Sequence, residues 1–134
     1  MRTFEATNRE LLNLYKGLES VKSIQGAKFA VLVGKNLKAL RDVLDPIEAA
    51  AVPSIEFQEL SVKMQQLIEK EDQDAITDLE NDNTELIEQR KKQLADVEEL
   101  LDNNIEVDLH PIHEDQLPHD ITGEQVERLL QIIE

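Results

Sequence analysis

From Ser54 to Asn103 the chain contains no glycine and no proline. These two residues are the strongest interrupters of regular structure, and apolar residues here recur at helical spacing. The sequence therefore predicts either one long helix or two helices with a polar break near Lys70 to Asp74. Ser54 offers an N-terminal cap for this region, and Pro53 separates it from what precedes, because proline lacks an amide hydrogen and clashes with the preceding turn.

The second part of this stretch carries an eleven-residue repeat. Seven positions follow one another at intervals of 3 and 4 residues, so that positions eleven apart correspond. Such a repeat is typical of a nearly straight or slightly right-handed coil, and either a long antiparallel hairpin or a dimeric coil would bury it. Its two polar members are expected to set register more than to add stability. The seam consists of Leu79, Asn83, Leu86, Arg90, Leu94, Val97 and Leu101.

The first half of the chain predicts two further helices. One begins at Thr7 or Asn8 and ends near Gly26, with leucines at helical spacing. The other runs from about Ala27 to residue 50 and has an apolar stripe wide enough for a core element. Pro46 lies inside it as a kink or a new first turn.

Small residues predict a close crossing between these two helices. Gly26, Ala30 and Gly34 follow one another at intervals of four residues, which leaves a smooth ridge on the second helix. Another backbone can approach such a ridge closely. We expect the helix from Thr7 to be the neighbour, with Gly17 at the crossing.

The pattern changes near the C-terminus. Ile105, Val107 and Leu109 alternate with charged residues and His110, which predicts one strand or an extended arm. A single strand needs a partner, and we expect a second copy of the chain to supply it across a two-fold axis. Farther on, Thr122 and Gln125 form a capping box ahead of a short helix. This helix must dock on another element, because it is too short to persist alone.

Together these patterns predict a mainly α fold: a helical bundle with a long helical hairpin or coil, a short extended arm and a C-terminal helix. The 134 residues are expected to form one domain. Its parts are a helical core at 7–50, the hairpin or coil at 54–103, and the arm and closing helix at 104–134. We expect a homo-oligomer, whose interaction residues are the seven seam positions together with Ile105, Val107 and Leu109.

Charge divides the chain into two unlike halves. Residues 1–68 hold 9 basic and 8 acidic side chains, residues 69–134 hold 5 and 21, and the formal net charge of the chain is -15. This acidity argues against direct nucleic-acid binding through phosphate contacts. It also motivates an alternative function, because evenly spaced carboxylates along a stiff helix can imitate phosphates to a basic groove.

Candidate chemical sites are few. His110, His113 and His119 fall among acidic residues and would suit a divalent metal, but their spacing is loose and prolines interrupt it. We expect a solvated loop that responds to pH instead. The acidic residues from Asp72 to Asp82 fail the calcium-loop template. With no cysteine and no glycine-rich phosphate loop, the sequence predicts no catalytic residue, no metal site and no cofactor.

Membrane association is not expected either. The longest apolar run, Phe29 to Val33, has five residues, whereas spanning a bilayer takes roughly 20. We also expect no signal peptide.

Two groups of residues, one near each end, carry a resemblance to a known family. The first group is Asn8, Glu10, Leu11, Leu14, Tyr15, Gly17, Leu18, Gly26-Ala27-Lys28-Phe29-Ala30 and Lys35-Asn36. The second is Val107-Asp108-Leu109-His110, Asp115-Gln116-Leu117-Pro118 and Thr122-Gly123-Glu124-Gln125. In this order they resemble small proteins of unknown function encoded by tailed bacteriophages. The resemblance covers about half the chain and implies a phage origin, expression in the bacterial host cytoplasm and a non-enzymatic role.

The leading expectation is therefore a phage accessory or assembly protein that acts through protein-protein contacts. Its partners would be further copies of itself and a phage structural protein or a host protein, and it would reside in the host cytoplasm or be associated with the virion. The alternative is an acidic DNA mimic that inhibits a host nucleic-acid-binding protein.

Overall fold

The computed structural model describes residues 1–134 and is mainly α-helical, with six α-helices and two short strands. The mainly α class predicted from the sequence is confirmed. The chain divides into two compact units, which we describe separately: unit 1 comprises residues 1–47 and 100–134, and unit 2 comprises residues 48–99. None of the helices combines the length and the apolar character needed to cross a membrane.

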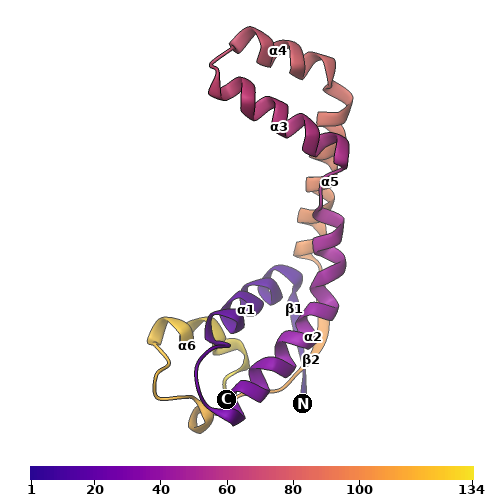
Figure 1. Cartoon of the computed structure of the whole chain (residues 1–134). Helices are drawn as coiled ribbons and strands as arrows, with labels where there is room; N and C mark the ends of the chain where they lie inside the picture. The colour runs from indigo at the N-terminus through magenta and orange to yellow at the C-terminus, as the bar shows by residue number, and fades with distance from the viewer. The chain divides into compact units, whose positions relative to one another are not determined.

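The elements follow one another in a simple order (Figure 1). Those of unit 1 are β1 (Arg2–Thr7), α1 (Asn8–Val21), most of α2 (Ala27–Ala51), β2 (Asn104–Leu109), the 3-10 turn η1 (Glu114–Gln116), α6 (Gly123–Leu129) and the 3-10 turn η2 (Leu130–Ile132). Those of unit 2 are α3 (Ile55–Glu69), α4 (Gln73–Asp82) and most of α5 (Thr84–Asp102). Pro46 lies inside α2 without ending it.

Side-chain caps are present at three helix starts, and those at Ser54 and Thr122 were predicted. Thr7 accepts from the Glu10 amide and Thr122 from the Gln125 amide, and in each case the later side chain reaches back to form a capping box. Ser54 accepts from an amide in the first turn of α3. Each cap satisfies an amide that has no partner inside its helix, so these helix starts are set locally.

β2 has its partner within the same chain. It pairs antiparallel with β1, and the register sets Phe4 opposite Val107 and Ala6 opposite Ile105. The expectation that this strand is completed by a second copy across a two-fold axis is therefore wrong. Only two inward-facing apolar residues mark β1, which is too short an alternation to stand out in the sequence.

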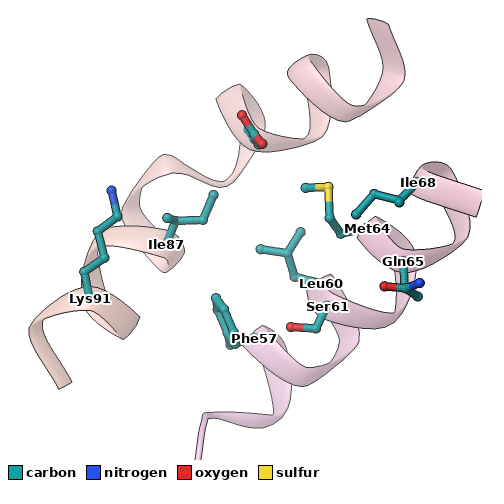
Figure 2. Close-up of a pocket in the computed structure, with 9 residues that line it drawn as sticks. Phe57, Leu60, Ser61, Met64, Gln65, Ile68, Ile87 and Lys91 are labelled. Carbon is teal, nitrogen blue, oxygen red and sulfur yellow. The ribbon is translucent and has the colours of Figure 1, made fainter. Parts of the chain in front are cut away.

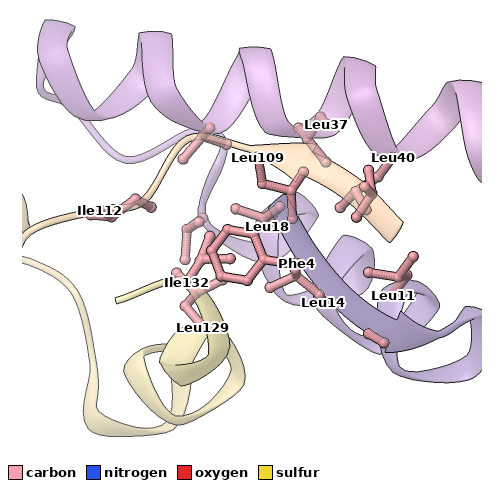
Figure 3. Packing of buried hydrophobic residues seen from close by; sticks show 14 of the residues in the cluster. Phe4, Leu11, Leu14, Leu18, Leu37, Leu40, Leu109, Ile112, Leu129 and Ile132 are labelled. Carbon is pink, nitrogen blue, oxygen red and sulfur yellow. The ribbon is translucent and has the colours of Figure 1, made fainter. Parts of the chain in front are cut away.

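One hydrophobic core fills unit 1 (Figure 3). Figure 3 shows side chains from α1, α2, both strands and the C-terminal segment converging on the same volume. Its fully enclosed members, each less than 2% exposed, include Leu11, Leu18, Leu40, Leu109, Ile112, Leu129 and Ile132. Fully burying side chains of this kind contributes about 1.5–3 kcal/mol each, so the core is the main source of stability in this unit.

A single polar side chain is fully enclosed in this core. Asn36 of α2 is 0% exposed, and its amide oxygen accepts from the backbone N–H of His110 at 2.7 Å while its amide nitrogen donates to the His110 carbonyl at 2.9 Å. The amide thus substitutes for a neighbouring strand at the end of β2. Because both backbone groups are satisfied, burying Asn36 brings no unpaired polar group.

The C-terminal residues close the core with a short parallel bridge. The Ile112 N–H donates to the Ile132 carbonyl, and the Glu134 N–H donates to the Ile112 carbonyl, both at 2.8 Å. At the far ends of the chain, Arg2 and Glu134 form an ion pair. The predicted docking of the final helix is confirmed, and its neighbour is α1.

The predicted crossing of α1 and α2 at small residues is wrong. Gly17 lies against α6, where a methyl group on its Cα would come within 2.9 Å of the Arg128 Cβ. Gly26, Ala30 and Gly34 are exposed. The reason is that α2 turns its wide stripe of large apolar residues toward the core, which leaves the small residues on the solvent side.

Two basic side chains of the first half pair with the same carboxylate inside unit 1. Lys22 and Arg41 lie 2.6 and 3.6 Å from the Glu19 carboxylate, and the Arg41 Nε donates to the Tyr15 hydroxyl at 3.2 Å. The hydrogen bond from Lys22, followed by that from Tyr15, lowers the pKa of Glu19 below its ordinary value. These side chains join α1 to α2 at the surface.

Two glycine-to-alanine changes test the packing of α6. Gly34 has no atom near the position of an added methyl group, so Gly34→Ala should raise the free energy of unfolding by up to about 1 kcal/mol through helix propensity. Gly17→Ala should instead lower it by about 1–2 kcal/mol, because the Arg128 Cβ and backbone cannot move aside without separating α6 from α1. Urea titration followed by circular dichroism measures both, and equal stabilisation by the two changes would show that α6 does not pack there.

Candidate interaction surface

Unit 2 has almost no core of its own. Leu60, at 6% exposed, is its only buried residue, and neither α4 nor α5 buries any side chain. Large apolar residues stay half exposed or more at several positions. These are Val52 (54%), Ile55 (70%), Val62 (59%) and Ile68 (50%). Small units need a high fraction of buried apolar surface to be stable, so unit 2 presents surface that a partner can cover.

An open apolar groove lies among the helices of unit 2 (Figure 2). Its volume is about 480 Å³. Its apolar lining consists of Phe57, Leu60, Met64 and Ile68 from α3 and Ile87 from α5. Figure 2 shows Leu60, Met64 and Ile87 extending into the same space between the helices. The polar residues that line it are Ser61, Gln65, Glu80 and Lys91.

The end of α3 is set by a tight turn that needs no glycine. Glu71 has a positive φ of 55°, its N–H donates to the Ile68 carbonyl at 3.1 Å, and the Asp72 N–H donates to the Leu67 carbonyl at 3.2 Å. This is the Schellman pattern of helix ends, here with glutamate in the left-handed position. The side chain of Asp72 then caps α4 through the Ala75 amide. Of the two alternatives left by the sequence, the polar break is the one present.

A second break divides the predicted seam. Asn83 lies between α4 and α5 with φ -124° and ψ 26°, and its amide nitrogen donates to the Leu79 carbonyl at 2.8 Å. Asparagine competes in this way with the helical hydrogen bonds. Residues 69–85 are therefore not one continuous helix, and the eleven-residue repeat does not form a single stripe.

Arg90 and Gln93 close the C-terminal end of α2. Arg90 Nη1 donates to the Ala51 carbonyl at 2.8 Å, and Gln93 Nε2 donates to the carbonyls of Ala50 and Val52, each at 2.8 Å. The last carbonyls of a helix lack partners inside it, and a positive charge there is favourable. The Arg90 guanidinium also lies 5.7 Å from the centre of the Phe57 ring, and Phe57 is one of the residues that line the groove.

The ten predicted interaction residues are divided between the two units. Six belong to unit 2, namely Leu79, Asn83, Leu86, Arg90, Leu94 and Val97. The other four, Leu101, Ile105, Val107 and Leu109, belong to unit 1. Val107 and Leu109 are buried in the core there, and Leu94 is the most exposed seam residue of unit 2, at 45%.

Sequence reasoning missed the groove, although it recognised the helical spacing of apolar residues after Ser54, some of which form one wall. A usable signal was present on the same helix. Ile55 and Val62, seven residues apart, place apolar side chains on a second face of α3. A helix that is apolar on two faces needs more than one neighbour, and unit 2 supplies too few.

The candidate metal ligands do not form a metal site. No three His, Asp or Glu side chains are grouped in a way that could hold a metal ion. His113 and His119 line an open cavity of about 710 Å³ in unit 1 together with Lys28 and Asp115. His113 lies 3.9 Å from the Glu134 carboxylate.

No protein-family model matches this chain, and no curated protein and no solved structure matches it significantly.

Replacing Arg90 tests how unit 2 is held together. Arg90→Ala should lower the local stability of unit 2 by about 1–2 kcal/mol, because it leaves a helix-end carbonyl without its charged donor. Lys92→Ala is the matched control, since Lys92 is an exposed base on the same helix. Native-state hydrogen exchange of α5 amides measures the difference, and similar exchange in the two variants would argue against a role for Arg90 as a cap.

Proposed function

We propose that this protein is a non-enzymatic accessory or assembly protein of a tailed bacteriophage that acts through protein-protein contacts made by unit 2. The host cytoplasm or the virion is its site of action. The observation that carries the proposal is the incomplete burial of unit 2, whose only buried side chain is Leu60. The apolar residues that do lie together are those of the groove lined by Phe57, Leu60 and Met64, and an exposed apolar groove marks an interaction site.

The energetics agree with a docking role. Covering a large apolar side chain such as Ile55 or Ile68 contributes about 1.5–3 kcal/mol when it goes from fully exposed to fully buried. A few such residues supply the affinity of a typical specific interface, in which a handful of side chains dominates. Unit 1 has a closed core, which makes it suited to serve as the folded anchor of the protein.

Capture of phage structural proteins tests this role. The tagged full chain, mixed with the separately expressed structural proteins of the phage that encodes it, should retain at least one of them. Ile55→Gln in unit 2 should reduce retention about tenfold, whereas Val31→Gln, a similarly exposed change in unit 1, should leave it unaltered. Retention of none of these proteins, or equal loss with both variants, would contradict the proposal.

An acidic mimic of nucleic acid is the second candidate. Unit 2 holds 15 acidic and 5 basic side chains, a net of -10. The observation that favours this candidate is α4, which carries four acids and no base and begins at a further acidic cap, Asp72. Its carboxylates are exposed and could present a row of negative charge to a basic groove.

Light scattering after size exclusion at low and at high salt separates the two candidates. We expect an assembly protein to have a measured mass above the 15.3 kDa of one chain. It should stay associated in high salt, because salt does not screen apolar contacts. A monomer, or an oligomer that dissociates in high salt, would favour the mimic. The same runs on Leu94→Gln test whether the exposed seam residue takes part in self-association, in which case the mass falls.

A further inference from the structure

We propose that the apolar groove of unit 2 binds an amphipathic helix of a partner protein whose polar face is basic. This inference rests on the proposed function, because it names the chemistry of the partner that unit 2 docks. Three features of the groove support it: its length along α3, its residue types and the charge around it.

The length of the groove matches a helix. Its α3 wall is formed by Phe57, Leu60, Met64 and Ile68, at intervals of 3, 4 and 4 residues. The eleven residue steps from Phe57 to Ile68 correspond to about 16 Å along the helix axis. A bound helix lying along this wall would engage it over three turns, with apolar side chains at i, i+3 or i+4, and i+7.

The lining residues suit such a ligand. Phe57, Met64 and Ile87 are only partly buried, and Ile68 is half exposed. Methionine is unbranched and adapts its shape to irregular partners, which makes it common in surfaces that accept helices. An incoming apolar face would bury these side chains and give unit 2 the core it lacks. Binding of such a helix should therefore raise the stability of the protein.

The charge around the groove selects a basic polar face. Glu80 lines the groove from α4, and the rest of α4 adds Asp74, Asp78 and Asp82 without any base. The one basic residue in the lining is Lys91, which lies 3.4 Å from the Glu88 carboxylate. With a net charge of -10 on unit 2, lysines flanking an apolar stripe would be attracted and glutamates repelled.

Synthetic peptides of about 18 residues, five helical turns, probe this chemistry directly. One peptide places leucines at i, i+3, i+4 and i+7 with lysines elsewhere, the second replaces every lysine by glutamate, and the third scrambles the first. Each carries a fluorescent label and is titrated with the full chain. We expect the lysine peptide to bind at least about tenfold more tightly than either of the others and to raise the Tm of the protein.

Two pairs of variants locate the binding. Ile68→Gln removes an apolar contact in the groove and should weaken peptide binding about tenfold, whereas Val62→Gln, on the same helix but outside the groove, should not. Glu80→Gln should weaken binding about threefold at low salt and less at high salt, whereas Glu59→Gln should not. Ile68 and Val62 are half exposed or more, so circular dichroism should show the Ile68→Gln and Val62→Gln variants folded.

The outcomes separate this inference from the proposed function. Equal binding to the lysine and glutamate peptides, or equal loss with Ile68→Gln and Val62→Gln, would overturn the basic helix as occupant, even if phage proteins are still captured. A dimer that dissociates with Ile68→Gln but not with Val62→Gln would assign the groove to a second copy and would also overturn it. Loss of capture alone, with peptide binding intact, would count against the proposed function only.

Discussion

The pairing of β1 with β2 is the constraint on which the rest of the structure depends. It joins the first residues of the chain to the segment that follows α5, so the core of unit 1 is assembled from both ends of the sequence. The buried amide of Asn36 extends this arrangement by bonding the backbone just beyond β2. None of the residues in that core belongs to residues 48–99, which form a separate unit.

Unit 2 is ordered by hydrogen bonds at its helix ends more than by burial. Backbone groups that a helix leaves unpaired are satisfied at three places. These are the turn at Glu71, the side chain of Asn83, and the side chains of Arg90 and Gln93. Such bonds specify geometry, but each contributes only about 1 kcal/mol net to stability. The apolar surface left over is the feature on which the proposed docking role rests. An interaction that buries it stabilises the unit and the complex together.

The parts of the fold that the sequence predicted correctly depend on neighbours a few residues apart. The helix start at Thr7 or Asn8 and the caps at Ser54 and Thr122 follow from side chains that bond to nearby backbone amides. The parts that failed depend on distant residues. Gly17 allows any helix to approach closely. The residues around it do not indicate whether that helix is α6 or α2. The eleven-residue repeat did not reveal the break at Asn83, because the periodicity of side chains carries no information on the backbone conformation of one asparagine.

By itself the sequence determined the helical class, most helix starts, the short strand near the C-terminus and the concentration of acidic charge in the second half. Propensity, capping and charge are properties of short segments, which is why they are readable without a structure. Only the tertiary structure decided that β1 completes the sheet, that Val107 and Leu109 are enclosed while Met64 and Ile68 border a groove, and that unit 2 lacks a core. Burial is a property of the whole arrangement, since an apolar side chain is covered or exposed according to residues far away in the chain.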